Sequence, residues 1–178
     1  AGRLINYHLR KMVYDSFTPP CLCDIIDSNI DAGMYDVEFR ELYTKKDIDQ
    51  LNSYIKHDRD EVLTYAAMEQ FRGKYLVQNR ATGQLYETPQ VAYMMIAASL
   101  FSKYPEETRL QTVKEYYDAI STFKISLPTP IMAGVRTPQR QFSSCVLIET
   151  GDSLDSINAT TSAVVKYVSQ KAGIGIGA

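Results

Sequence analysis

The spacing of apolar residues changes once along this chain, close to Ser121. Before that residue, apolar side chains recur every three or four positions, which is the pattern of helices that bury one face. After it, Gln141 to Glu149 alternates in the way that is typical of a strand. With 178 residues the chain can build one domain with a substantial core. We therefore predict a helical domain over residues 1–121, followed by the opening of an α/β unit over residues 122–178.

Turn residues divide the first part into a series of helices. Proline, glycine and side-chain caps are expected to set their limits. Val91 to Phe101 is apolar on nearly all sides and much too short to cross a membrane, so it is predicted to be a central buried helix. A small hairpin is expected over residues 74–87. The other predicted helices are Ala1–Asp15, Cys21–Ala32, Asp36–Leu42, one capped by Thr44, Asp60–Phe71, one capped by Thr88 and one starting at Pro105.

The second part is predicted to contain strands and one long helix. A short strand, Phe123–Leu127, leads into a Pro-Thr-Pro corner, and the strand Gln141–Glu149 follows it. A helix over Asp152–Lys171 is expected to bury one side, made of Leu154, Ile157, Thr161, Val164 and Val168. A further strand is predicted to begin at Gly173. Because a strand needs neighbours for its hydrogen bonds, we expect the sequence to be a fragment of a longer polypeptide.

Composition excludes some classes of function. A net charge of −2 gives no electrostatic case for binding nucleic acid or an anionic membrane, and no signal peptide opens the sequence. Three cysteines cannot form a complete disulfide framework, which favours a reducing, cytoplasmic location. Cys21 and Cys23 are too close for a relaxed mutual bridge and lack further ligands for zinc, so no metal site is predicted.

Cys145 permits three interpretations. A cysteine within an apolar strand is commonly a small buried hydrophobe. A redox thiol would need a second cysteine, which Cys21 and Cys23 are poorly placed to supply. A thiol-dependent hydrolase would need a neighbouring base, whereas His8 and His57 belong to the predicted helical domain. If Cys145 is redox-active, its partner cysteine lies outside these residues.

Three polar or glycine-rich segments also have competing interpretations. The turn Gly151-Asp152-Ser153 opens a helix, so it is either a simple N-cap or a nucleotide site in which the carboxylate accepts from ribose hydroxyls. The segment 173–177 follows a helix, the reverse of the dinucleotide fingerprint, and is better suited to close backbone approach. For residues 57–60, His-Asp-Arg-Asp, capping and solvated ion pairs are a sufficient explanation.

Several separated motifs closely resemble one family, the large (alpha) subunits of class I aerobic ribonucleotide reductases of the bacterial and phage type. The resemblance covers essentially the whole chain. The first group of motifs is Lys124-Ile-Ser-Leu-Pro-Thr-Pro-Ile-Met, Gly134-Val-Arg-Thr-Pro, Arg140-Gln-Phe-Ser-Ser-Cys-Val-Leu-Ile and Gly151-Asp-Ser-Leu-Asp-Ser-Ile. The second group is His8-Leu-Arg-Lys, His57-Asp-Arg-Asp, Gly73-Lys-Tyr-Leu-Val-Gln-Asn-Arg and Phe101-Ser-x-Tyr-Pro.

The resemblance implies a fold and a set of residue roles. The fold would be mainly α, a helical N-terminal domain followed by the first strands of a ten-stranded α/β barrel. The reaction would be thiyl-radical reduction of ribonucleoside diphosphates, with Cys145 as the reductant that ends in a disulfide with a later cysteine. The implied substrate contacts are Thr129, Ser144, Cys145 and Gly173; those to the specificity effector are Asp152, Ser153 and Leu154; and Lys11 would border an ATP-cone activity site.

The resemblance also implies partners that this sequence does not contain. They are the remainder of the alpha subunit, a second alpha subunit, a radical-generating, metal-containing beta subunit, and thioredoxin or glutaredoxin. The chain itself would bind no cofactor, only dNTP or ATP effectors. The ATP cone, the thiyl cysteine and the second redox cysteine are absent, and Gly175-Ile-Gly-Ala departs mildly from the usual motif. We therefore expect the chain alone to be inactive; the alternative is a helical nucleotide-binding or interaction module without redox chemistry.

Overall fold

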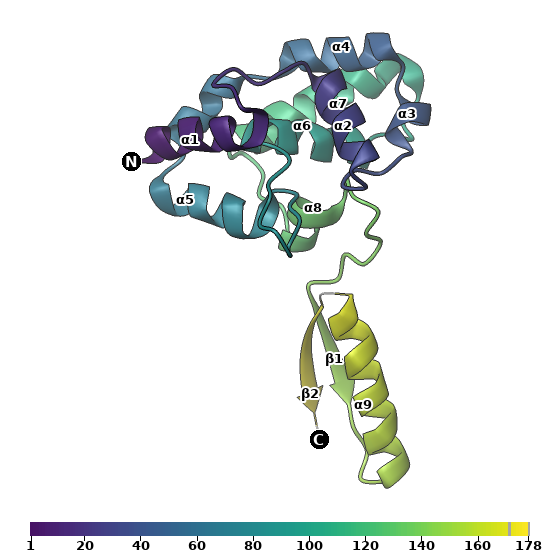
Figure 1. Cartoon of the computed structure of the whole chain (residues 1–178). Coiled ribbons are helices and arrows are strands. Elements are labelled where there is room, and N and C mark those ends of the chain that lie inside the picture. The colour runs from purple at the N-terminus through teal and green to yellow at the C-terminus, as the bar shows by residue number, and fades with distance from the viewer. Residues whose placement is uncertain (171, 178) are drawn as a thin grey trace. The chain divides into compact units, whose positions relative to one another are not determined.

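The computed structural model describes residues 1–170 and 172–177, which are mainly helical, as predicted (Figure 1). The chain forms two compact units, Ala1–Gln139 and Arg140–Ala178. The predicted boundary lay after residue 121, eighteen positions earlier. The difference arises because the segment from 122 to 139 packs on the helical unit, as described below. None of the helices among the described residues combines the length and the apolar character that a membrane span requires.

The first unit consists of helices that agree closely with most of the predicted ones. Their bounds are α1 Gly2–Tyr14, α2 Leu22–Asp31, α3 Phe39–Leu42, α4 Lys45–Tyr54, the 3-10 helix η1 His57–Val62, α5 Tyr65–Gln70, the π-helical turn η2 Phe71–Tyr75, α6 Pro89–Leu100, α7 Glu106–Ser121 and α8 Thr129–Gly134. The single helix predicted over Asp60–Phe71 is wrong. Leu63 is extended, and Thr64 starts a new helix by accepting a hydrogen bond from the amide of Ala67, 3.2 Å away.

Helix α6 is the centre of the first unit, as its uniform hydrophobicity predicted. All residues from Pro89 to Ala98 are buried, and α7 packs beside it (Figure 1). Pro89 stands at the first helical position, where a missing amide hydrogen costs nothing. Thr88 is the N-cap, as expected, but its side chain makes no capping hydrogen bond; its hydroxyl lies 3.4 Å from that of Tyr14 instead.

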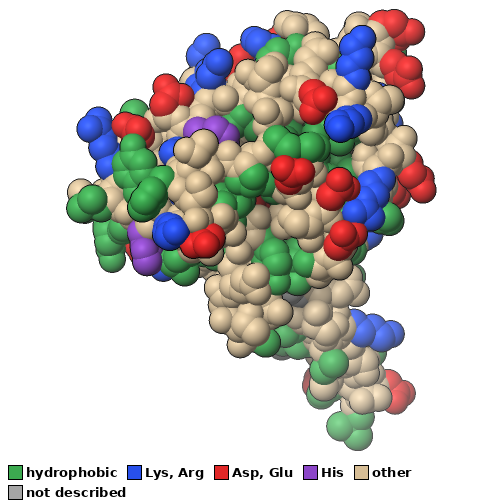
Figure 2. All heavy atoms as spheres, turned by 45° about the horizontal axis from the view of Figure 1, so that its top comes forward, with side chains coloured by type: hydrophobic (Ala, Val, Ile, Leu, Met, Phe, Trp, Pro, Cys, Tyr) green, Lys and Arg blue, Asp and Glu red, His purple; other side chains and the backbone are tan. Residues whose placement is uncertain are grey.

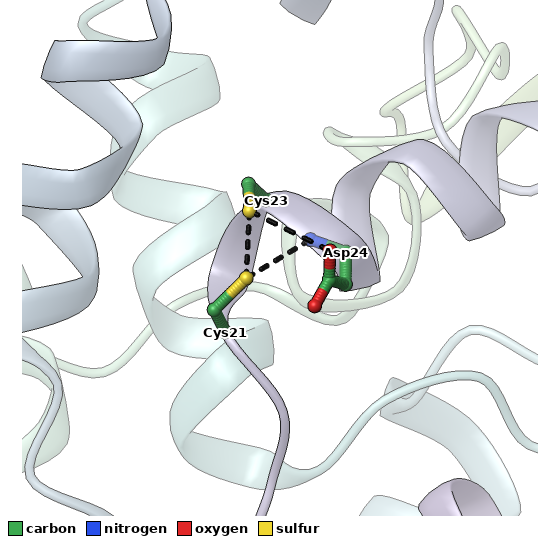
Figure 3. Close-up of side chains that lie close together, drawn as sticks. All are labelled: Cys21, Cys23 and Asp24. Carbon is green, nitrogen blue, oxygen red and sulfur yellow. Dashed lines mark hydrogen bonds between the residues drawn. The ribbon is translucent and has the colours of Figure 1, made fainter.

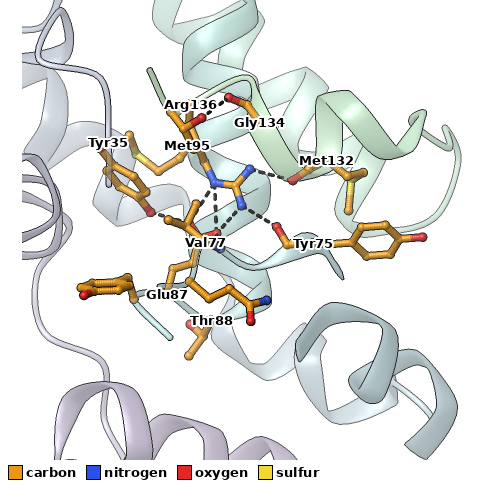
Figure 4. A network of polar contacts seen from close by, with 12 residues as sticks. Tyr35, Tyr75, Val77, Glu87, Thr88, Met95, Met132, Gly134 and Arg136 are labelled. Carbon is orange, nitrogen blue, oxygen red and sulfur yellow. Dashed lines mark hydrogen bonds and ion pairs between the residues drawn. The ribbon is translucent and has the colours of Figure 1, made fainter. Parts of the chain in front are cut away.

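A buried ion pair joins the segment after α8 to the rest of the first unit. Arg136 and Glu87 are both fully buried and in direct contact (Figure 4). The guanidinium also donates to the carbonyls of Met132, at 2.7 Å, and Tyr75, at 2.9 Å, while Tyr35 donates its hydroxyl to the carboxylate. These contacts come from four separate parts of the sequence. They explain why the compact unit extends to Gln139.

The strand predicted over Phe123–Leu127 is wrong. Phe123 has a φ of +62°, and the amide of Lys124 returns to the carbonyl of Ala119 at 2.9 Å, so the chain closes the end of α7 there. The Pro-Thr-Pro corner then starts α8, a helix that was not predicted because the sequence there is rich in proline. The hairpin predicted over 74–87 is reduced to one antiparallel bridge, Gln78 to Leu85, around a turn with Gly83 at a φ of +74°.

The second unit is a parallel pair of strands, β1 Cys145–Glu149 and β2 Gly173–Gly177, connected by the helix α9 Leu154–Ser169. The observed strand β1 therefore starts four residues later than predicted, at Cys145 and not at Gln141. The predicted buried side of α9 is also wrong: Leu154 is 85% exposed and Ile157 49% exposed, whereas Thr160 is buried. Thr160 shares a hydrogen bond of 2.9 Å with Thr150 at the end of β1, so small side chains face the sheet.

The capping box of α4 gives a direct test of the local sequence reading. The Thr44 hydroxyl accepts from the amide of Asp47 at 3.2 Å, and the Asp47 carboxylate accepts from the amide of Thr44 at 2.9 Å. Thr44→Ala is expected to lower the free energy of unfolding by about 1 kcal/mol, because one helix-end amide loses its partner. Urea unfolding followed by circular dichroism measures this. Thr44→Ser, which keeps the hydroxyl, should remain close to the unchanged protein; equal losses in both variants would contradict the capping explanation.

Candidate functional site

The structure brings together three of the residues predicted to contact substrate. In the parallel register Cys145, the first residue of β1, pairs with Gly173, the first residue of β2. The amide of Gly173 donates to the carbonyl of Ser144 at 3.1 Å. Residues that are 28 positions apart in sequence are thus immediate neighbours at the amino ends of two strands. Cys145 is exposed, so the interpretation as a buried hydrophobe is wrong for the structure of this unit.

Glycine at position 173 keeps the space beside the thiol free. A Cβ at this position would lie 3.7 Å from the Cys145 sulfur and only 3.3 Å from the Ser144 carbonyl oxygen. Farther along β2 the requirement for glycine is stricter, because a Cβ at Gly175 would lie only 2.6 Å from a methyl group of Leu147. Side chains of β1 therefore fill the space over Gly175 and Gly177, whereas Gly173 puts no side chain beside Cys145. The missing side chain at Gly173 permits another molecule to approach the sulfur closely.

The backbone of Ser144 contacts Gly173, while its expected main-chain contact with substrate stays a prediction. Its carbonyl is occupied by the amide of Gly173, and its side chain is exposed. Thr129 is the first residue of α8 and belongs to the first unit. Its predicted place beside Ser144 and Cys145 therefore stays a prediction.

The predicted effector residues lie at the opposite end of β1 from Cys145. Ser153 is the N-cap of α9, and its hydroxyl accepts from the amide of Ser156 at 3.2 Å. The amide of Gly151 donates to the Ser156 hydroxyl at 2.7 Å, which closes the turn. Asp152 takes no part in the cap, and its exposed carboxylate has no hydrogen bond or ion pair among the described residues. The N-cap interpretation of the turn is confirmed for Ser153, which caps α9. The nucleotide-site interpretation stays a prediction, and the Asp152 carboxylate is the group that would accept from a ligand.

Lys11, in the first unit, and Leu154, in the second, are both exposed. Leu154, the first residue of α9, shows 85% of its surface to solvent. Lys11 lies on α1, where its ammonium group contacts the Asp15 carboxylate at 2.8 Å and the Asp15 carbonyl at 2.9 Å. The hydrogen bond from Lys11 holds the pKa of Asp15 below its ordinary value. The roles of Leu154 and Lys11 in effector and ATP binding stay predictions.

The thiol hydrolase interpretation finds no support within the second unit. The two histidines of the sequence, His8 and His57, both belong to the first unit. Burial lowers the pKa of His57 to about 4, with a further contribution from the charge of Arg10. The unit that contains Cys145 therefore holds no histidine that could serve as its base.

Sequence reasoning missed the burial of Asp60. The expectation of solvated ion pairs over residues 57–60 is wrong for this residue, which is fully buried and accepts from the Gln90 amide at 2.9 Å. Its second carboxylate oxygen has no partner among the described residues. Burial raises the pKa of Asp60 to about 7. No local sequence pattern predicts the burial of Asp60, because alternating charged residues at the start of a helix are ordinarily exposed.

Charge on the surface does not gather by sign. On the face shown in Figure 2, basic and acidic side chains are interspersed, in keeping with the net charge of −2. The described residues contain one group that could hold a metal ion, formed by Cys21, Cys23 and Asp24. Asp24, the residue directly after Cys23, adds a third potential ligand, so the expectation that the two cysteines lack a further ligand is wrong.

Comparison with known proteins identifies what the chain is similar to. Residues 61–140 match the model of the ribonucleotide reductase all-alpha domain. Over all 178 residues the chain is 62% identical to the ribonucleoside-diphosphate reductase 1 subunit alpha of Escherichia coli (strain K12) and 61% identical to the subunit alpha of Haemophilus influenzae. It is 50% identical over 176 residues to the subunit alpha of Enterobacteria phage T4. The chain spans 23% to 24% of the length of these relatives.

Proposed function

The chain belongs to the family of ribonucleoside-diphosphate reductase alpha subunits, and on this premise we propose that it works as part of such a catalytic subunit. The reaction is the reduction of ribonucleoside diphosphates to 2′-deoxyribonucleoside diphosphates, which supplies precursors for DNA synthesis. The observation that carries the proposal is the juxtaposition of Ser144, Cys145 and Gly173, with no side chain at position 173 beside the exposed thiol. The identity of 62% over the whole chain supports it.

Cys145 is the proposed reductant. Its exposed thiol and that of a cysteine outside these residues together give two hydrogen equivalents as they join in a disulfide, while the C–O bond at the ribose 2′ position breaks, a C–H bond replaces it and the oxygen leaves as water. Gly173 and the main chain of Ser144 border the same space, where a ribose can approach without meeting a Cβ. Thr129 is proposed as a further substrate contact. The parallel strands β1 and β2 would open the ten-stranded barrel of the family.

Regulation is proposed at two places. Asp152, Ser153 and Leu154 form the specificity-effector site for a dNTP or ATP, in which the free carboxylate of Asp152 accepts from ribose hydroxyls and the amino end of α9 favours phosphate. Lys11 borders the ATP-cone activity site. The partners are the rest of the alpha subunit, a second alpha subunit, the radical-generating beta subunit and thioredoxin or glutaredoxin, within the cytoplasm.

A chimera tests the redox role of Cys145. This chain replaces the 178 matched residues of the E. coli subunit alpha, and reduction of a ribonucleoside diphosphate is measured with the beta subunit and a thiol reductant. We expect sustained turnover, and its loss to background in Cys145→Ser with effector nucleotide still bound. Cys23→Ser is the matched thiol control and should keep turnover. The 178-residue chain alone should show none.

The alternative functions give different results in the same assay. A nucleotide-binding module without redox chemistry leaves turnover of the Cys145→Ser chimera unchanged, and that result would overturn the proposal. Turnover by the 178-residue chain alone would contradict the proposal that the radical-bearing residue lies elsewhere. A hydrolase would consume a thioester or ester substrate without any reductant.

A further inference from the structure

Two thiols and a carboxylate converge at the start of α2, far in sequence from Cys145. The ligand atoms of Cys21, Cys23 and Asp24 all lie within 4.8 Å of one another. The two sulfurs are 2.6 Å apart, and the Cys23 sulfur lies 3.7 Å from a carboxylate oxygen of Asp24. Figure 3 shows the three side chains turned toward one another. Both cysteines are half-buried and Asp24 is exposed, so solvent ions can reach the group.

The backbone explains how residues two positions apart can face each other. Within a helix, side chains at positions i and i+2 point to different sides. Cys21 is instead the N-cap, with extended φ and ψ of −64° and 152°, which turns its thiol back over the first helical turn. Leu22 between them is fully buried, and its amide donates to the Asn52 side chain at 2.9 Å. The central residue is thus anchored while the two thiols remain at the surface.

The local charges suit a cation with affinity for sulfur. Asp24 has no ion pair among the residues that the structure describes, so no lysine or arginine competes for its carboxylate. The amide of Asp24 already donates to the Cys21 sulfur at 3.5 Å, and the amino end of α2 favours negative charge, which two thiolates and a carboxylate would supply. Zn²⁺ accepts such a mixed set of sulfur and oxygen ligands in tetrahedral geometry.

We propose that Cys21, Cys23 and Asp24 bind a thiophilic divalent cation of the Zn²⁺ class, with a fourth position open to water or to another ligand. Tetrahedral coordination with Zn–S bonds of about 2.3 Å holds two sulfurs roughly 3.7 Å apart. The two sulfurs, now 2.6 Å apart, would therefore move apart on binding. The site is independent of the proposed reductase chemistry, which uses Cys145.

Metal titration of the reduced 178-residue chain tests the proposal. Cd²⁺ serves as the probe, through its thiolate charge-transfer absorption, and Zn²⁺ is measured by competition with a chromophoric chelator. We expect one ion per chain at micromolar metal, and affinity lowered at least about tenfold in Cys21→Ser and in Cys23→Ser. Asp24→Asn should weaken binding less. Cys145→Ser is the matched control and should bind as the unchanged chain does, and circular dichroism should show every variant folded.

Three results would overturn the proposal. The first is the absence of stoichiometric binding at micromolar Cd²⁺ or Zn²⁺. The second is binding that survives Cys21→Ser and Cys23→Ser together but disappears in Cys145→Ser. The third is a stable disulfide between Cys21 and Cys23 that persists under thiol reductant, seen as a mass two hydrogens lower, since sulfurs in that state cannot ligate the ion.

Discussion

Arg136→Met is expected to lower the free energy of unfolding of the helical unit by about 3–5 kcal/mol. The reason is the charge that remains. Glu87 is fully buried, and its carboxylate would keep only hydrogen bonds from the Tyr35 hydroxyl and from the amide of Val77, at 2.8 Å. A single carboxylate without its cation is costly in a medium of low dielectric constant.

Two backbone carbonyls that lose their hydrogen-bond donor account for the second part of the lost unfolding free energy. Arg136 satisfies the carbonyls of Met132 and Tyr75, and a methionine side chain of similar length cannot donate to either (Figure 4). Because the pair joins residues 49 positions apart, its loss also releases the segment after α8 from the first unit. We expect residues near 136 to become the most sensitive to proteolysis.

Urea unfolding followed by far-ultraviolet circular dichroism measures the effect. Arg40→Met is the matched control, because Arg40 also contacts two carboxylates, those of Asp27 at 3.1 Å and Asp31 at 2.7 Å, but on the surface. Water screens that interaction, and a much smaller change is expected. In the double variant Glu87→Met, Arg136→Met, stability should recover only in part, since Met132 and Tyr75 remain without donors. Equal effects of the buried and the surface arginine would contradict the explanation.

Asp60→Asn is expected to stabilise the protein strongly at about pH 8 and hardly at all at about pH 4. Burial raises the pKa of Asp60 from 3.8 to about 7. Between these two values the folded chain holds the proton and the unfolded chain has released it, so stability falls as pH rises. The fall amounts to on the order of 4 kcal/mol, complete above about pH 7. Asparagine has no charge to bury and keeps an oxygen for Gln90.

The dependence of stability on pH separates the contribution of Asp60 from those of the charged residues around it. Arg10 and Asp58 also act on the Asp60 carboxyl, Arg10 by lowering its pKa and Asp58 by raising it. His57 contributes in the opposite sense, because its lowered pKa costs stability as pH falls from 6.5 to about 4. That contribution is common to both proteins, so the difference between them reports Asp60.

The control for Asp60→Asn is Asp58→Asn, an exposed carboxylate two residues away in the same 3-10 helix. Because this variant keeps Asp60, its stability should fall with rising pH as that of the unchanged protein does. Chemical unfolding at several pH values provides the measurement. A difference between Asp60→Asn and the unchanged protein that stays constant from about pH 4 to about pH 8 would exclude a buried carboxyl that releases its proton in this range.

Sequence alone was sufficient where the determining interactions are local. Thr44 and Asp47 form their predicted capping box, Gly33 ends α2 with a φ of +70°, and Pro89 starts α6. On α4, the amphipathic spacing of Ile48 and Leu51 matches their place in the core. In each case, atoms within one or two helical turns decide the structure.

Local patterns failed where a segment had two possible partners. Phe123 to Leu127 has strand-like composition, but no strand among the described residues takes its hydrogen bonds, and the chain closes α7 instead. On α9, the apolar side that spacing favoured is exposed, because Thr160 and not Leu154 faces the sheet of this unit. Propensity is a weak preference that contacts distant in sequence override.

The residue types and motif spacing of this sequence determined the family, the helical character and the candidate residues Ser144, Cys145 and Gly173. Only the tertiary structure decided that Gly173 lies against Ser144 and Cys145, that Asp60 and Arg136 are buried, and that Cys21 faces Cys23. The physical reason is that burial and proximity depend on how remote segments pack. A residue's own neighbours in sequence determine its backbone preference, but they do not determine which side chains exclude water from it.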